Sequence, residues 1–254
     1  MLWRFGVFVT AAIFWFPVTR LAGSISVFVM TGVVDKALFA ALFAILVILV
    51  AIRIITKSWS FVTLPAFLMV GSAFLLALID SQGERSVFLI LATVIFYLLV
   101  LASHRLSLYA RDMTAKTLYD LAVITTLFSW YVALFGWYLN IAIPTWVLMS
   151  ISAVVTIFVS YSSFVIHELK THERWAYATF LAIFLAEITW MQNFWPFGYL
   201  TSGVITLIIF YVLWTSIVEY SRDKMSYKRL FFQALFMVLA VVIILLSTKW
   251  YPVL

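Results

Sequence analysis

The chain has 254 residues, of which 66% are hydrophobic and only 10% are charged, and its mean hydropathy is +1.16. An average soluble domain carries roughly 25% charged residues, so this composition excludes a water-soluble fold and predicts an all-α integral membrane protein. The formal charge of +6 does not indicate a nucleic-acid partner, because the Lys and Arg residues are scattered between apolar runs. The absence of cysteine excludes disulfides, thiolate metal sites and cysteine nucleophiles.

Apolar runs long enough to cross a bilayer follow one another along nearly the whole chain. A helix needs about 20 mostly apolar residues to span the hydrocarbon core. We predict a polytopic bundle of about nine transmembrane helices, within a range of eight to ten. The runs cover residues 3–19, 36–56, 60–79, 86–104, 117–138, 144–166, 174–192, 198–218 and 229–248. They leave no room for a separate soluble domain, so residues 1–254 are predicted to form a single membrane domain.

The first run is less regular than the others. Pro17 and Arg20 interrupt it, and a further short apolar stretch follows from Leu21 to Val34. Stretches of that length are typical of interfacial or re-entrant segments. The segment is therefore compatible with ten crossings or with one long, kinked first helix.

The connections between the predicted spans differ in positive charge. One alternate set holds Arg4, Arg53, Lys57, Arg105, Arg111, Lys116, Lys170, Arg174, Arg222, Lys224, Lys228 and Arg229, and the other holds Arg20, Lys36, Arg85 and Lys249. Since cations near span ends accumulate on the cytoplasmic side, this asymmetry predicts that the N-terminus is inside and the C-terminus outside. A cytoplasmic (plasma) membrane is the expected location.

Two kinds of connection are expected between these spans. The turns Asn140–Pro144 and Gln192–Gly198 are short and uncharged, so the helices on either side should form tight antiparallel hairpins. The segment from Arg105 to Asp120 mixes apolar and charged residues. It predicts either an amphipathic helix on the inner leaflet or helices that simply continue into the cytosol.

Glu187 is the one ionisable side chain that lies well inside a predicted span. Intramembrane carboxyls are costly, so they mark functional sites by default. Counting back from the following turn places Glu187 about 7–12 Å below the outer end of its helix. We expect a protonatable carboxyl in apolar surroundings, as a proton-coupled transporter needs. The alternative is a carboxyl that bonds a neighbouring hydroxyl and only joins two helices.

Polar and aromatic residues follow Glu187 up to the next turn. We predict that Trp190, Gln192 and Asn193 complete a substrate or proton site with Glu187. A plain hairpin is the alternative, because Asn193 also suits a helix end and Gly198 suits a turn.

No catalytic, cofactor or metal motif is recognised. His167 and His172 stand five residues apart, about 140° around a helix, whereas zinc-binding histidines on one helical face stand four apart. We interpret them as part of a solvated cytoplasmic turn. No Gly-rich phosphate loop or G-x-S-x-G sequence occurs, so neither a cofactor nor a metal is expected.

Three functional classes remain open from the sequence. The first is a small transporter or translocation subunit with Glu187 as its protonatable intramembrane site. The second is a non-catalytic scaffold or assembly subunit of a membrane complex, and the third is an enzyme acting on a lipid-linked substrate. The expected partners are the lipid bilayer and either other proteins or further copies of the chain, with no nucleic acid.

Overall fold

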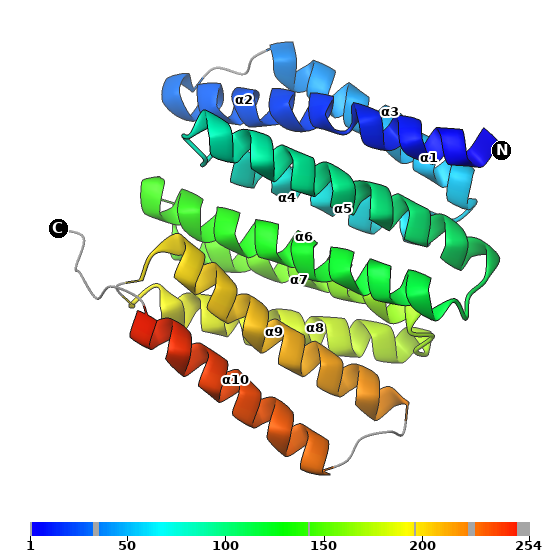
Figure 1. Cartoon of the computed structure of the whole chain (residues 1–254). Coiled ribbons are helices and arrows are strands. Elements are labelled where there is room, and N and C mark those ends of the chain that lie inside the picture. The colour runs from blue at the N-terminus through cyan, green and yellow to red at the C-terminus, as the bar shows by residue number, and fades with distance from the viewer. Residues whose placement is uncertain (1, 33–35, 142, 196, 223–226, 248–254) are drawn as a thin grey trace. The chain divides into compact units, whose positions relative to one another are not determined.

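The computed structural model describes residues 2–32, 36–141, 143–195, 197–222 and 227–247. These residues form ten α-helices and one short 3-10 helix, η1, and contain no strand, so the all-α prediction is confirmed (Figure 1). The elements are α1 (Leu2–Ile13), α2 (Trp15–Thr31), α3 (Lys36–Thr56), η1 (Trp59–Phe61), α4 (Thr63–Leu76), α5 (Gln82–Leu108), α6 (Met113–Asn140), α7 (Thr145–Ile166), α8 (Thr171–Gln192), α9 (Tyr199–Ser221) and α10 (Tyr227–Ser247).

Seven segments in the described part of the chain are long and apolar enough to cross a membrane. They are Gly6–Val29, Lys36–Thr56, Trp59–Leu76, Gln82–Leu108, Met113–Asn140, Thr145–Ile166 and Tyr199–Ser221. The chain is therefore a multi-pass membrane protein. The remaining two predicted runs correspond to α8, in which residues such as Glu187 and Gln192 lower the hydropathy, and to α10, whose described apolar part, Phe231–Ser247, is shorter.

The first span was predicted to end at residue 19, and this end is wrong. The helix does not stop near residue 19 but continues past Arg20 to Thr31, with one break at Phe14 between α1 and α2. Pro17 lies in the first turn of α2, where its ring crowds the preceding turn and its missing N–H removes one hydrogen bond, so the break falls just before it. Figure 1 shows α1 continuing into α2. Of the two alternatives, ten crossings or one long, kinked first helix, the structure therefore has the kinked helix.

The connection between α5 and α6 contains no amphipathic helix of its own. Instead α5 continues to Leu108 and α6 begins at Met113, so the alternative in which the helices extend is the correct one. The Arg105 guanidinium pairs with Asp112 at 2.6 Å. Asp112 also accepts a hydrogen bond from the backbone N–H of Ala115 at 3.1 Å, and so caps the start of α6.

The described helices divide into two compact units, with the boundary inside α6 between Trp130 and Tyr131. In unit 1, α2 packs against α3 and α4, and α1 packs against α3 and α5. The indole N–H of Trp130 donates to the carbonyl of Phe67 at 2.8 Å. A side chain at Gly71 would lie 2.6 Å from the Trp130 ring, so this glycine is what lets the indole approach α4.

Unit 2 contains the end of α6 together with α7 to α10. Within it α7 packs along α8, and α9 packs against both α8 and α10. The predicted hairpin of α8 with α9 is confirmed by this packing; residues 142 and 196, in the two short turns, lie outside the described residues. A Cβ at Gly203 of α9 would lie 2.9 Å from the backbone of Val132, so α6 and α9 approach each other closely.

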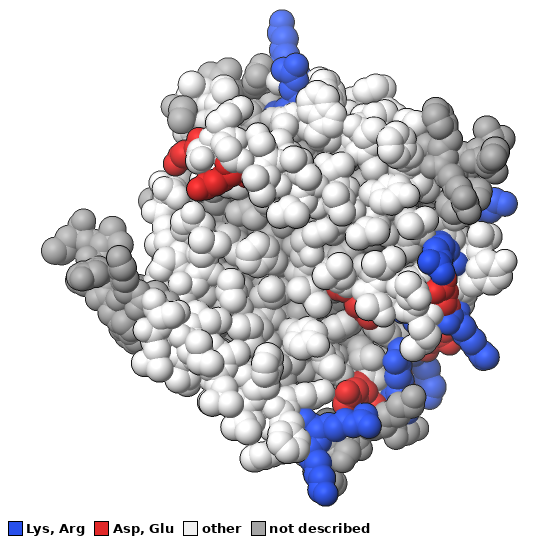
Figure 2. All heavy atoms as spheres, in the orientation of Figure 1, with Lys and Arg blue, Asp and Glu red and all other residues white. Residues whose placement is uncertain are grey.

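Large apolar side chains cover the outer faces of the helices. Phe43 of α3 is 69% exposed and Ile90 of α5 is 64% exposed, values that suit contact with lipid. Lys and Arg side chains gather at helix ends, and the flanks between those ends are largely uncharged (Figure 2). The sequence predicted a single membrane domain over residues 1–254. Because this depends on how the two units are joined, it stays a prediction.

Candidate functional site

The four residues predicted as one site lie on two different faces of α8. Glu187 and Trp190 are exposed, whereas Gln192 is only 2% exposed and points into unit 2. Glu187 and Gln192 are five residues apart, which is about 140° around a helix. Asn193, directly after α8, is half-buried. The structure thus brings Gln192 and Asn193 inward and leaves Glu187 and Trp190 on the outside.

Gln192 uses only part of its hydrogen-bonding capacity. Its Oε1 atom accepts a hydrogen bond from the hydroxyl of Thr206 on α9 at 3.1 Å. Its Nε2 atom, and both amide atoms of Asn193, are buried and have no hydrogen-bond partner among the described residues. A buried polar atom left without a partner costs about 1–3 kcal/mol. Such atoms indicate a place where water or a ligand group binds.

Buried hydroxyls of α7, α8 and α9 surround these amides. Thr189 lies one turn before Gln192, and its hydroxyl is 3.4 Å from the hydroxyl of Ser152 on α7. The Thr206 hydroxyl is also 3.0 Å from the backbone carbonyl of Ser202, and its single hydrogen is shared between this carbonyl and Gln192 Oε1. We call this group the amide cluster; its members are Ser152, Thr189, Gln192, Asn193, Ser202 and Thr206.

A row of polar residues runs along one face of α7. Its members recur every three or four residues, and the four that lie within α7 are at most 1% exposed. We call this row the α7 polar stripe; it consists of Ser152, Thr156, Ser160, Ser163 and His167. At about 1.5 Å per residue the stripe is about 22 Å long, which is most of the hydrocarbon thickness.

Side chains from neighbouring helices meet the stripe at several levels. The Tyr131 hydroxyl of α6 lies 2.8 Å from that of Thr156. The Trp214 indole of α9 donates to the Ser163 hydroxyl at 3.1 Å. Between these two levels, the Ser160 hydroxyl is buried and has no hydrogen-bond partner in the described part of the chain.

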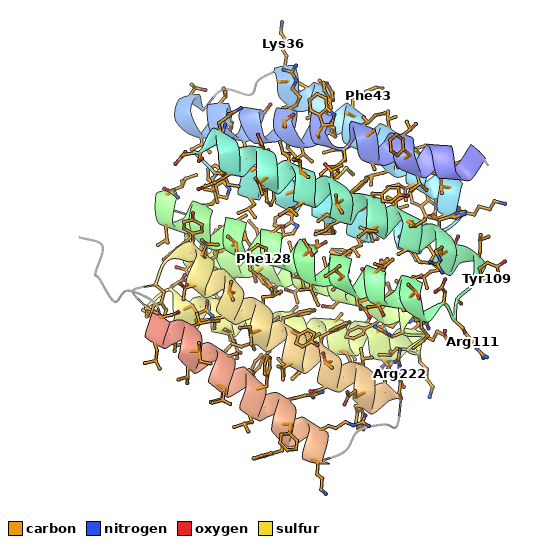
Figure 3. The ribbon with its side chains drawn as sticks, in the orientation of Figure 1. Lys36, Phe43, Tyr109, Arg111, Phe128 and Arg222 are labelled. Carbon is orange, nitrogen blue, oxygen red and sulfur yellow. The ribbon has the colours of Figure 1, made fainter. Side chains whose placement is uncertain are left out.

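The stripe ends at His167, on the predicted inner side. The Nδ1 atom of His167 is 2.7 Å from Nη2 of Arg222, which follows α9 (Figure 3). Because a guanidinium can only donate, Nδ1 accepts, and the proton of the neutral ring is on Nε2. Next to this contact is a pocket of about 340 Å³; its lining includes His167, Glu168, Lys170, Glu173, Tyr177 and Tyr220.

The alignment of His167 with the α7 serines was not predicted from the sequence. His167 does lie in the turn that follows α7, as predicted, and is half-buried there. Its ring contacts Arg222, and its ring centroid is 5.7 Å from that of Trp214. The spacing of the hydroxyls along α7 was a usable signal, because polar residues every three or four positions share one helical face.

Unit 1 has a separate pocket of about 520 Å³ where α1, α5 and the α5–α6 turn meet; it is lined by Val7, Tyr97, Leu101, His104, Arg105, Leu108, Tyr109 and Asp112. Figure 3 shows Tyr109 at that turn. The Nδ1 atom of His104 lies 3.3 Å from the carbonyl of Ile55 on α3. The pocket lining therefore combines apolar residues with polar and charged ones.

A family model described as a protein of unknown function, DUF5656, matches residues 10–247. The chain belongs to the DUF5656 family. The matched region of this family contains both the amide cluster and the α7 polar stripe. No curated protein and no solved structure matches the chain.

Proposed function

We propose that the chain is a small transporter or translocation subunit that passes a small neutral polar solute through unit 2. The observation that carries this proposal is the α7 polar stripe, a buried row of hydroxyls that leads from the amide cluster to His167. Other buried polar residues, such as Thr10, Ser72 and Ser103, are spread over several helices. The alignment of the stripe along one buried face of a single helix supports a pathway.

The chemistry of the stripe favours an uncharged solute. Placing a charge at the centre of a bilayer costs about 2.5–3.5 kcal/mol on insertion scales, and more on others, unless an opposite charge is near. The stripe and the amide cluster offer hydroxyls and amides instead. Gln192 Nε2 and Ser160 Oγ supply hydrogen-bonding positions at two depths. Polyols, amides and urea-like molecules can use such groups in succession.

The proposal includes a direction through the membrane. We propose nine crossings in a cytoplasmic membrane, with the N-terminus inside and the C-terminus outside. In this topology the amide cluster lies near the outer surface and His167 near the inner one, so the stripe joins the two sides. The bilayer is the main partner, and no nucleic-acid partner is proposed.

Solute flux into vesicles tests this function. The purified chain is reconstituted into liposomes, and their swelling in glycerol or urea is followed by light scattering. Sodium chloride serves as the charged control solute. We expect faster swelling than in empty vesicles for the neutral solutes only. Ser160→Ala and Gln192→Leu should return swelling toward the empty-vesicle rate.

The matched control is Ser150→Ala, because Ser150 lies on the same helix but is exposed and bonds to the carbonyl of Trp146. This variant should keep the full rate. Wild-type vesicles that swell no faster than empty ones, or a Ser160→Ala rate equal to wild type, would refute the pathway.

A second candidate function is a non-catalytic assembly subunit. One observation favours it: Glu187 is exposed on α8, where a carboxyl inside a membrane needs a partner. Its predicted role as the protonatable site of a transporter stays a prediction. Purification in mild detergent separates the two candidates, because an assembly subunit should co-purify with another membrane protein in a fixed ratio.

A further inference from the structure

Two opposite charges lie on exposed faces of two apolar helices, of which α2 belongs to a candidate span and α8 crosses the membrane in the proposed nine-crossing topology. Arg20 is exposed on α2 and lies within the candidate span Gly6–Val29. Its guanidinium lies over the ring of Phe16, 5.6 Å from the ring centroid. Glu187 is exposed on α8 and has no hydrogen bond or ion pair with another described residue. Each helix therefore presents one charge on an otherwise apolar face.

The depths of the two charges match. Arg20 lies about 4 Å past the midpoint of the span Gly6–Val29, and Glu187 lies about 8 Å past the midpoint of α8, at 1.5 Å per residue. In the proposed nine-crossing topology these are the first and seventh spans, which the chain traverses in the same direction. Both charges then lie in the same half of the bilayer, about 4 Å apart in depth.

We propose that α2 of one copy of the chain packs against α8 of a second copy, with Arg20 paired to Glu187. A charge facing hydrocarbon is strongly disfavoured unless an opposite charge meets it. The chain itself supplies the complementary charge at the required depth, so a second copy is the partner that the observations favour. The proposal uses the topology above but is independent of the transport pathway.

The apolar residues around the two charges suit such a contact. Ile183 and Trp190 flank Glu187 on the exposed face of α8 and are 57% and 48% exposed. On α2, Val27 is 41% exposed, and Gly23, one turn after Arg20, has open space where a side chain would be. Small residues let transmembrane helices approach closely, so a neighbouring helix can come close beside Arg20.

The contact joins two different surfaces, which has a consequence for assembly. Each copy presents an α2 face to one neighbour and an α8 face to the other. Such heterologous contacts form a closed ring when the rotation between copies permits, and an open chain otherwise. The expected product in the membrane is an oligomer rather than a monomer.

Crosslinking between two tagged chains tests the contact directly, because the natural chain has no cysteine. One chain carries Arg20→Cys, the other carries Glu187→Cys, and a short bismaleimide is added to membranes that contain both. A crosslinked product with both tags supports the proposal. The control replaces Arg20→Cys with Phe43→Cys, on the exposed face of α3, and should give no such product.

A chain carrying both cysteines distinguishes contact between copies from contact within one copy. If it crosslinks only to itself, and the two singly substituted chains never crosslink to each other, the proposal is overturned. A product as abundant with Phe43→Cys as with Arg20→Cys would overturn it as well.

Charge reversal provides the second test, read by native mass spectrometry from lipid nanodiscs. Wild type should be oligomeric, and Arg20→Glu or Glu187→Arg alone should lose the oligomer. The chain with both reversals restores the pair and should regain it, which also shows that the single variants did not merely misfold. A monomeric wild type, or a double variant that stays monomeric, would overturn the proposal.

Discussion

The hydroxyls of Tyr131 and Thr156 lie 2.8 Å apart in the interior of unit 2. Thr156 also donates to the backbone carbonyl of Ser152 at 2.7 Å. Because a threonine hydroxyl carries a single hydrogen, the bond between the two side chains must be donated by Tyr131. This hydrogen bond, donated by Tyr131, joins α6 to the α7 polar stripe at Thr156.

Removing the Tyr131 hydroxyl should weaken the packing of α6 on α7 by a small amount. We expect Tyr131→Phe to lower the free energy of unfolding by about 0.6 kcal/mol, and by about 1.7 kcal/mol at most, as for other hydrogen bonds between transmembrane helices. Unfolding in detergent, combined in a double-mutant cycle with Thr156→Val, measures the coupling. Tyr211→Phe, at an exposed tyrosine, is the control; a coupling of zero would contradict the assignment.

Ser160→Ala should separate stability from transport. The Ser160 hydroxyl is buried without a partner among the described residues, so its removal relieves a desolvation penalty and should stabilise the fold by about 1 kcal/mol. The same change removes a hydrogen-bonding position from the proposed pathway and should slow solute flux. The free energy of unfolding and the solute flux are measured on the same protein preparation. A loss of stability would show that the hydroxyl has a structural partner.

Gly203→Ala should destabilise unit 2. The new Cβ would lie 2.6 Å from Val132 Cγ2 and 2.9 Å from the Val132 backbone, which cannot move aside as a flexible side chain can. Overpacking of this kind costs about 1–3 kcal/mol. Thermal unfolding in detergent should show the loss. Gly23→Ala is the matched control, because the space around Gly23 is open, and it should leave the melting temperature nearly unchanged.

Lys57→Gly should stabilise unit 1. Lys57 directly follows α3, has a φ of 55° and donates its backbone N–H to the carbonyl of Arg53 at 2.9 Å. This left-handed conformation costs a residue with a Cβ about 1–2 kcal/mol, and the greater freedom of glycine in the unfolded chain offsets part of the gain. We expect a net increase of about 0.5 kcal/mol. Lys57→Ala controls for the lost charge, and an equal gain there would contradict the explanation.

Single cysteines should label from opposite sides of the membrane. Lys36→Cys, at the start of α3, should react with an impermeant maleimide from outside. Arg111→Cys and Arg222→Cys should react only after the inner side is opened (Figure 3). Labelling of positions 36 and 111 from the same side would contradict the nine-crossing topology.

Hydropathy and helix length predicted most of the fold, because an apolar run in a bilayer must satisfy its own backbone hydrogen bonds. Arg20 shows where this reasoning failed. A charge next to a proline resembles the end of a span, yet Pro17 only breaks the helix at Phe14, and α2 continues past Arg20 to Thr31. Hydropathy does not show whether a proline ends a helix or only kinks it, so it could not locate the end of the first span.

The candidate site was predictable only in part, for a geometric reason. Glu187 and Gln192 were predicted to share one site because they are close in the sequence. On a helix, however, residues five positions apart point about 140° away from each other. The face that turns inward depends on packing against α7 and α9, and the composition of α8 alone does not determine it. The unsatisfied amides of Gln192 and Asn193 became visible only once their neighbours were placed.

The marginal hydropathy of α8 has a consequence for how the protein is made. A helix with Glu187 inside it and with His172, Glu173 and Arg174 at its start enters a bilayer less readily than its neighbours do, since charged residues oppose insertion by the translocon. In the proposed nine-crossing topology, the long contact of α8 with α7 would favour insertion of the two helices together as a hairpin. Insertion of α8 would then require α7 to stay beside the translocon until α8 emerges.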